Sequence, residues 1–150
     1  MKTIKANMDQ LELAAELFNQ YRIFYHQKDD FESCKEYLRE RITKSESVIF
    51  LSVEEGEEGL IPLGFTQLYP IFSSVSLKRH WLLNDLFVTE KARRKGVGEE
   101  LLHTARKYAE ETNAKGLTLE TGEDNHNAQR LYERFGFQKH SEFHYTYTVE

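Results

Sequence analysis

Cysteine, proline and long apolar runs are scarce in this sequence of 150 residues. The single cysteine, Cys34, excludes an intramolecular disulfide and a thiolate metal cluster, and it suits a reducing compartment. No apolar run approaches the length of a membrane span, and the first residues lack the apolar stretch of a signal peptide. We therefore expect a soluble, cytoplasmic protein without a membrane partner. The histidines show no metal-ligand spacing, so we expect no metal either.

Basic residues are outnumbered by acidic ones, and the formal net charge is −5. Lys91, Arg93, Arg94 and Lys95 nevertheless gather in one short turn, while no long basic face exists elsewhere. This balance argues against nucleic acid as a partner. The content of 39% hydrophobic and 13% aromatic residues is that of a packed globule, and the length favours a single domain over residues 1–150.

Hydrophobic periodicity predicts alternating strands and helices. We expect strands at 2–6, 47–53, 61–69, 81–88, 116–120 and 144–149, and helices at 9–26, 30–43, 97–112 and 125–136. Pro70 is expected to end the third strand or to bend it away. This order predicts an α/β fold with a mixed sheet covered by helices.

The junction after residue 88 is the most informative stretch. An apolar run of strand length leads into the basic turn, which closes with Gly96 and Gly98 as a helix begins near Val97. The first N–H groups of a helix have no intrahelical partner, and that end is partly positive. Glycines let a ligand approach these groups closely. The junction thus suits a phosphate or pyrophosphate, with Arg93 and Arg94 as further donors.

Two familiar phosphate loops do not fit this junction. The nucleoside-triphosphate loop requires glycine, four residues and then Gly-Lys-Ser/Thr, a run that is absent. A dinucleotide fingerprint needs a third small residue where Leu101 stands. A helix start with a solvated basic turn is the alternative from these residues alone.

Two motifs resemble those of one known family. The pattern Arg93-x-x-Gly96-x-Gly98, between a strand and a helix, resembles the acetyl-CoA signature of the GCN5-related N-acetyltransferase (GNAT) superfamily. The run from Asn125 to Phe137 resembles its second signature: Asn, two residues, Ala, two residues, Leu-Tyr, three residues, Gly-Phe. The segment 83–88 looks like the branch containing the yeast Hpa-type enzymes, whose members acetylate polyamines or basic protein tails.

The resemblance implies a fold, a cofactor and site residues. The fold would be a mixed, mostly antiparallel central sheet of about six to seven strands flanked by four helices, the acyl-CoA N-acyltransferase fold. Acetyl-CoA would be the cosubstrate. Backbone N–H groups of the central strand would stabilise the negative charge that develops on the thioester oxygen. The residues implied are Leu86, Phe87 and Val88 for that role, and Arg93, Arg94, Lys95, Gly96, Val97, Gly98, Glu99, Asn125, Ala128 and Tyr132 for holding the cofactor.

Acid and base candidates follow from the chemistry of acetyl transfer to an amine. A phenol, with an ordinary pKa near 10, can protonate the departing thiolate, and the resemblance gives this role to Tyr132. From the residues alone, a core aromatic is the default interpretation of Tyr132, and a plain helix cap is the alternative for Asn125. For the base, Glu120, Asp85 and Glu123 are candidates in that order, with a solvated or ion-paired carboxylate as the alternative for each.

The sequence thus predicts an acetyl-CoA-dependent N-acetyltransferase acting on a primary amine. A small amine or polyamine is favoured, and a protein lysine or N-terminus is open. Acidic loops at Asp29, Asp30 and Glu32, and at 54–58, favour a cationic acceptor. The alternatives are a non-catalytic coenzyme A-binding or sensor module and a domain that binds a partner through the basic turn. The alternating tail, 144–149, suggests strand pairing with a second subunit and hence a homodimer.

Overall fold

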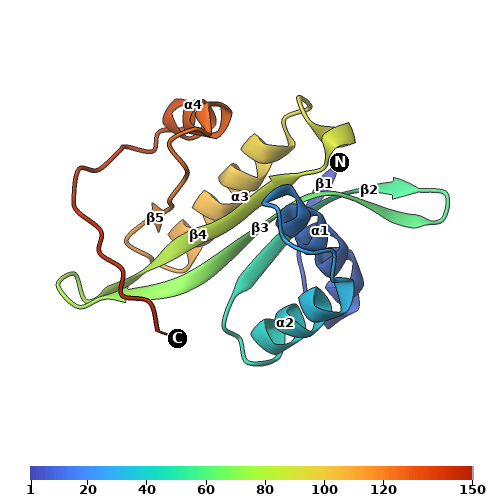
Figure 1. Ribbon diagram of the computed structural model, residues 1–150, viewed down its shortest axis with the longest axis horizontal. Coiled ribbons are helices and arrows are strands. Elements are labelled where there is room, and N and C mark those ends of the chain that lie inside the picture. Colours follow the sequence, from blue (N-terminus) through green and yellow to red (C-terminus); the bar gives the residue numbers. More distant parts are fainter. Residues whose placement is uncertain (150) are drawn as a thin grey trace. The chain divides into compact units, whose positions relative to one another are not determined.

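A computed structural model describes residues 1–149 of the chain, which form two compact units (Figure 1). The first unit is Met1–Glu120, and the second begins at Thr121. The first unit holds the sheet and three of the four α-helices, and the second holds the last helix and the C-terminal tail.

The sheet has five strands in the order β1-β2-β3-β4-β5. Neighbours among the first four pair antiparallel, whereas β5 pairs parallel to β4, so the sheet is mixed and mostly antiparallel, as predicted. The strand count is lower than the predicted six to seven. The bounds are β1 Lys2–Lys5, β2 Val48–Gly56, β3 Gly59–Ser73, β4 Lys78–Val88 and β5 Leu117–Thr118.

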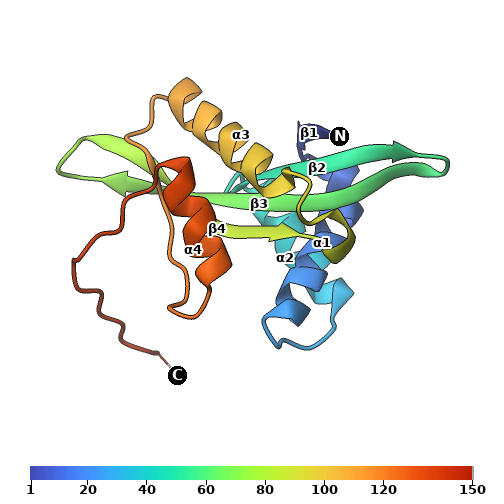
Figure 2. The ribbon, with the colours of Figure 1, turned by 90° about the horizontal axis from the view of Figure 1, so that it is seen from above.

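Helices cover both faces of this sheet. Helices α1 (Leu11–Phe24) and α2 (Phe31–Thr43) lie on one face, and α3 (Val97–Glu111) lies on the other (Figure 2). A short 3-10 helix, η1 (Met8–Gln10), leads into α1, and another, η2 (Glu90–Ala92), follows β4. The face of α3 that the sequence predicted to be apolar is buried, including Leu101, Leu102 and Ala105. The sheet and these helices therefore form one layered core.

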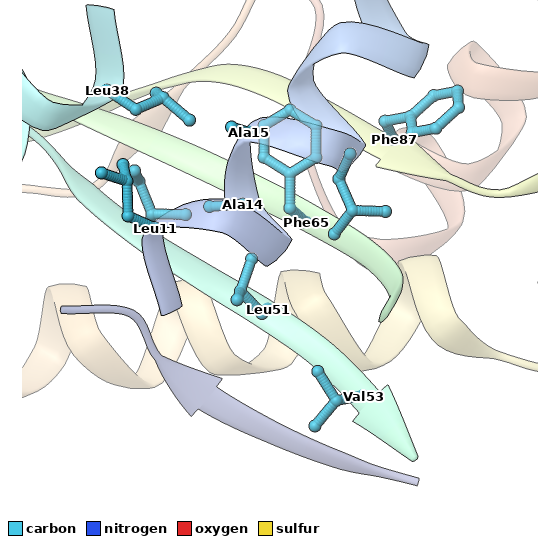
Figure 3. Close-up of a cluster of buried hydrophobic side chains, with 10 residues drawn as sticks. Leu11, Ala14, Ala15, Leu38, Leu51, Val53, Phe65 and Phe87 are labelled. Carbon is cyan, nitrogen blue, oxygen red and sulfur yellow. The ribbon is translucent and has the colours of Figure 1, made fainter. Parts of the chain in front are cut away.

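The hydrophobic core between α1, α2 and the sheet is drawn in Figure 3. Small side chains of α1, Ala14 and Ala15, let the helix approach the sheet closely, and Phe65 of β3 fills the space beneath them. The ring of Phe65 meets the ring of Tyr21 edge-on at 5.7 Å. This packing fixes the position of α1 over β3 and β4.

A β-bulge at Asn84 interrupts the pairing of β3 with β4. Gln67 pairs with Asp85 and Leu68 with Leu83, so Asn84 has no partner residue in β3. An extra residue in a ladder shifts the alternation of side chains by one. Asp85 therefore faces the opposite side of the sheet from Leu83, although the two are two positions apart.

Contacts on the two sides of the bulge confirm this change of face. Trp81, before the bulge, packs toward α3, where its indole Nε1–H donates to Thr112 Oγ1 at 2.9 Å. Phe87, after the bulge, packs toward α1, with its ring 6.1 Å from that of Tyr21. Without the bulge, Trp81, Asp85 and Phe87 would share one face. The bulge thus places Asp85 under α1.

Pro70 does not end β3, which continues to Ser73, so the first of the two predicted outcomes is wrong. Pro70 pairs with Trp81, whose N–H donates to Gly116 of the other neighbouring segment, so that pair exchanges no hydrogen bond. On the opposite side, the pairing with β2 already stops at Leu68. The missing N–H of proline is therefore not required at this position.

The second unit consists of α4 (His126–Phe135) and a tail without regular structure. The predicted final strand at 144–149 is wrong: these residues pair with no strand among residues 1–149. The apolar side chains of this segment lie in solvent, with Tyr145 89% and Tyr147 92% exposed. Alternation alone did not produce a strand, because a strand also needs a neighbour to complete its hydrogen bonds.

Candidate functional site

The second half of β4 has one open edge. β5 pairs with β4 only at Trp81 and Leu82, and no other described residue pairs with that edge of β4 from Leu83 to Val88. The ladder with β3 shows which amides face the opening. Thr89 N donates to Leu63 O at 2.9 Å, so the N–H group of Thr89 points toward β3. The N–H groups of successive residues in a strand point alternately to its two edges.

This alternation separates the three predicted oxyanion donors. The N–H groups of Leu86 and Val88 point to the open edge, whereas that of Phe87 points to β3. Arg93 Nε donates to Val88 O at 3.2 Å, which is consistent with this direction. Leu86 and Val88 therefore offer unpaired backbone donors to a ligand beside β4.

The start of α3 forms a cup of backbone N–H groups, as the sequence predicted. Gly96 is the N-cap in the left-handed conformation, with φ of 81°, and no side chain caps the helix. A Cβ added at Gly96 would meet nothing within 4 Å, so the N-terminus is open on this side. Gly98, Val97 and Glu99 belong to the first turn, whose N–H groups have no intrahelical acceptor.

The basic turn before α3 is exposed. Among residues 1–149, no ion pair engages Lys91, Arg94 or Lys95, and Arg94 itself has a left-handed φ of 64°. Arg93 is held differently: besides Val88 O, its guanidinium lies 5.5 Å from the ring centre of Phe24 in α1. Arg93 thus ties the turn to both β4 and α1, and the other cations stay available to an anion.

Asp85 is a buried carboxyl group immediately before the predicted oxyanion donors. It is 4% exposed. Gln67 Nε2 donates to Oδ2 at 2.8 Å and Asn84 Nδ2 to Oδ1 at 3.2 Å, and a hydrogen bond with Tyr21 also acts on the carboxyl group. Burial raises the pKa of Asp85, against the opposing effect of these three neutral donors. A raised pKa lies closer to the value near 7 that suits a general base at neutral pH.

The other two base candidates have different surroundings. Glu120, the last residue of the first unit, and Glu123, in the second unit, are both exposed. Asp85 is thus the one candidate base that is buried, although the sequence placed it second.

Helix α4 carries the remaining predicted residues on one face. Asn125 is its N-cap, and Asn125 Oδ1 accepts from Ala128 N at 3.3 Å, so the capping role is confirmed. Tyr132 lies one turn beyond Ala128 on the same face, half-buried, with its ring 5.8 Å from that of Phe137. Gly136 ends the helix with φ of 122°, which turns the chain so that Phe137 N donates to Tyr132 O.

Gln67 is the residue of this region that the sequence did not reveal. It is fully buried and donates to Asp85, yet it is a single glutamine in an apolar strand. The only signal in the sequence was its alternation with Phe65 and Tyr69, which places this polar side chain on the inward face of the strand. Its pairing with Asp85 depends on the bulge at Asn84, which no sequence pattern marks.

No group of three or more metal-ligating side chains is present in residues 1–149. In that same range, no helix has the length and apolar character needed to cross a bilayer.

Comparisons with known proteins agree on one family. The sequence model described as "Acetyltransferase (GNAT) family" matches residues 11–137. An uncharacterized N-acetyltransferase of Bacillus subtilis, YhfO, is 48% identical over 136 residues, covering 90% of this chain and 89% of its own. A crystal structure of a probable acetyltransferase superposes with a TM-score of 0.92 at 43% identity, covering 100% of this chain and 99% of the other. The D-amino-acid N-acetyltransferase HPA3 of Saccharomyces cerevisiae is 33% identical over 76 residues, covering 51% of this chain and 47% of HPA3, which fits the predicted resemblance to Hpa-type enzymes.

Proposed function

This chain belongs to the acetyltransferase (GNAT) family and is an acetyltransferase, and on that premise we propose that it transfers the acetyl group of acetyl-CoA directly to a primary amine. The family uses acetyl-CoA as its cosubstrate. The observation that carries the proposal is the continuity of three features along residues 85–99: a buried carboxyl group, an open strand edge and an uncapped helix start.

The residues present fit coenzyme A. The pyrophosphate would accept hydrogen bonds from the first N–H groups of α3, where the conformation of Gly96 leaves the approach clear. Arg94 and Lys95 would add charge from the exposed turn. Arg93 would hold the turn against Val88 and Phe24 while its remaining N–H groups face the anion. Asn125, Ala128 and Tyr132 of α4 would contact the rest of the cofactor.

Acetyl-CoA supplies the acetyl group as a thioester, so a nitrogen–carbon bond forms as the carbon–sulfur bond breaks. The N–H groups of Leu86 and Val88 would donate to the oxygen on which negative charge develops. Asp85 would accept the proton that the amine loses, a role that its raised pKa supports. The Tyr132 hydroxyl would donate a proton to the departing sulfur.

The acceptor proposed is a small cationic amine, with a polyamine or an amino acid as examples. The buried carboxyl group of Asp85 and the acidic β2–β3 turn at 54–58 favour a positively charged acceptor. HPA3 is named for acetylation of D-amino acids, which makes an α-amine a further candidate acceptor here.

A panel of amines tests this function. Purified protein with acetyl-CoA is incubated with spermidine, 1,4-diaminobutane, D- and L-alanine and a lysine-containing peptide, and released thiol is measured. We expect turnover with at least one of these amines above the rate without an amine. Tight binding of coenzyme A without turnover of any amine would instead indicate a non-catalytic coenzyme A-binding module.

We further propose that the chain forms a homodimer through its tail. Phe143, Tyr145, Tyr147 and Val149 are each at least 85% exposed and occupy alternate positions, so an extended tail would present them on one side. A row of exposed apolar side chains of this kind is typical of an interaction surface. An unpaired sheet edge of a second copy would complete the hydrogen bonds of the tail.

A further inference from the structure

The amide group of Gln67 has one engaged end and one unengaged end. Gln67 is 0% exposed, and its Nε2 donates to Asp85 Oδ2 at 2.8 Å. Its Oε1 is buried and accepts no hydrogen bond from any residue that the structure describes. A buried acceptor without a donor costs about 1 to 3 kcal/mol, so this arrangement is expected where a ligand supplies the donor.

The carboxyl group beside it also lacks a positively charged partner. The groups that hydrogen-bond to Asp85 are Gln67, Asn84 and Tyr21, all neutral. A buried carboxylate is normally paired with a cation, and no described lysine or arginine forms an ion pair with Asp85. The free protein therefore presents two adjacent acceptor groups, the Asp85 carboxylate and Gln67 Oε1, and no cation to bind them.

The side chains that surround this pair are mainly tyrosines. Tyr21 of α1 forms a hydrogen bond with Asp85. The pKa of Tyr69 in β3 is raised by burial, by its hydrogen bond with Tyr37 and, to a smaller extent, by the nearby Asp85 charge. The Tyr69 hydroxyl in turn shares a hydrogen bond of 2.7 Å with Tyr37 of α2, whose ring carries the Arg41 guanidinium at 4.5 Å. Arg41 forms ion pairs with Glu40 and Glu46 rather than with Asp85. The elements packed over Asp85 thus present phenols to it.

An ammonium group matches two adjacent acceptors, because it carries several N–H donors and a positive charge. We propose that Gln67 both positions the catalytic carboxyl group and recognises the substrate. Its Nε2 holds the Asp85 carboxylate in place. Its Oε1 accepts a hydrogen bond from an N–H group of the acceptor amine, which Asp85 deprotonates. This inference rests on the proposed function, and it adds to it a residue that selects an amine bearing at least two N–H donors.

Two variants separate this role from a structural one. Gln67→Met removes both polar atoms at similar volume. Thr66→Val is the matched control, since Thr66 is equally buried and donates to the backbone oxygen of Asp85 at 2.8 Å, not to its carboxyl group. With the best acceptor of the amine panel, Gln67→Met should lower kcat/KM about ten- to a hundredfold, as loss of hydrogen bonds to charged groups does. Thr66→Val should remain within about twofold of wild type, even if it melts earlier.

The pH profile gives a second readout. Removing the Nε2 donor takes away a bond that favours the carboxylate, so the pKa of Asp85 should rise in Gln67→Met. Because the base must be ionised, the acidic limb of kcat/KM should move to higher pH in this variant and stay in place in Thr66→Val. Carbon-13 NMR of the Asp85 carboxyl group, assigned with Asp85→Asn, should show the same shift without any turnover.

Wild-type protein supplies a test that needs no variant to fold. Titration with 1,4-diaminobutane should move the side-chain carbonyl signal of Gln67 and lower the pKa of Asp85, since a bound cation favours the carboxylate. Unchanged signals at saturating amine, or unchanged kcat/KM and pH limb in Gln67→Met, would overturn the inference while turnover by the wild type still upheld the proposed function. Absence of turnover with every amine would overturn the proposed function, and the inference with it.

Discussion

The conformation of Gly96 provides a sharp test of the phosphate cup. Gly96 has φ of 81°, and a Cβ built there meets no atom within 4 Å, so Gly96→Ala creates no steric clash. Its cost to folding is the left-handed conformation alone, about 1 to 2 kcal/mol. That cost corresponds to a fall in Tm of about 2 to 8 °C for a chain of this size.

The same substitution should affect coenzyme A binding by a separate route. We expect alanine to shift the peptide before α3 away from the left-handed conformation in part, which would redirect the first N–H groups of the helix away from a bound pyrophosphate. Losing hydrogen bonds to a charged group costs about 1.5 to 3 kcal/mol, or about a ten- to a hundredfold increase in the Kd of coenzyme A. Isothermal titration calorimetry with coenzyme A measures this directly.

Gly59 supplies the matched control. It also has a positive φ, of 116°, and no atom lies within 4 Å of its added Cβ, but it lies in the β2–β3 hairpin. Gly59→Ala should therefore lose at least as much stability, because its φ lies further from the left-handed region open to alanine, and it should bind coenzyme A with wild-type affinity. Equal affinity in both variants, or equal losses in both, would refute the reasoning that the geometry of Gly96 serves the ligand.

Three further predictions concern the base, the acid and the tail. Burial raises the pKa of Asp85 above its unfolded value, so the folded state binds this proton more tightly and loses stability as pH rises through the two pKa values. Asp85→Asn should therefore raise Tm at pH 8, by an amount that shrinks toward pH 4, while lowering kcat about a hundredfold. An equal gain in Tm at both pH values would contradict this. Tyr132→Phe should lower kcat about a hundredfold with little change in the KM for acetyl-CoA, and unchanged turnover would remove the acid role; Tyr108→Phe, on α3, is the control. A chain ending at residue 140 should elute as a monomer where the full chain elutes as a dimer, and light scattering that shows a monomeric full chain would dismiss the tail as a dimer contact.

Much of the fold could be predicted because local signals agreed with the final packing. The periodicity of 97–112 matches α3, whose buried face is the predicted one, and Asn125 and Gly136 begin and end α4 as their backbone preferences indicate. The cup at Gly96 was predictable for the same reason, since it is a local feature of a helix start.

Features that depend on pairing could not be predicted from the sequence. Because of the bulge at Asn84, side chains after it face the opposite side of the sheet from the one that strict alternation predicts. The sequence pattern of Trp81, Leu83, Asp85 and Phe87 is the same with or without a bulge. Consequently the contact of Gln67 with Asp85 was not foreseen, and Asp85 ranked behind the exposed Glu120 as a base. The tail illustrates the reverse case, in which a strand-like pattern lacks a partner within residues 1–149.

The most direct test of the whole account is a crystal structure of the protein with acetyl-CoA bound. We expect the pyrophosphate to accept hydrogen bonds from the backbone N–H groups of Val97, Gly98 and Glu99. We expect the thioester oxygen to lie beside the N–H groups of Leu86 and Val88 on the open edge of β4. A pyrophosphate bound elsewhere, or a thioester remote from that edge, would contradict it.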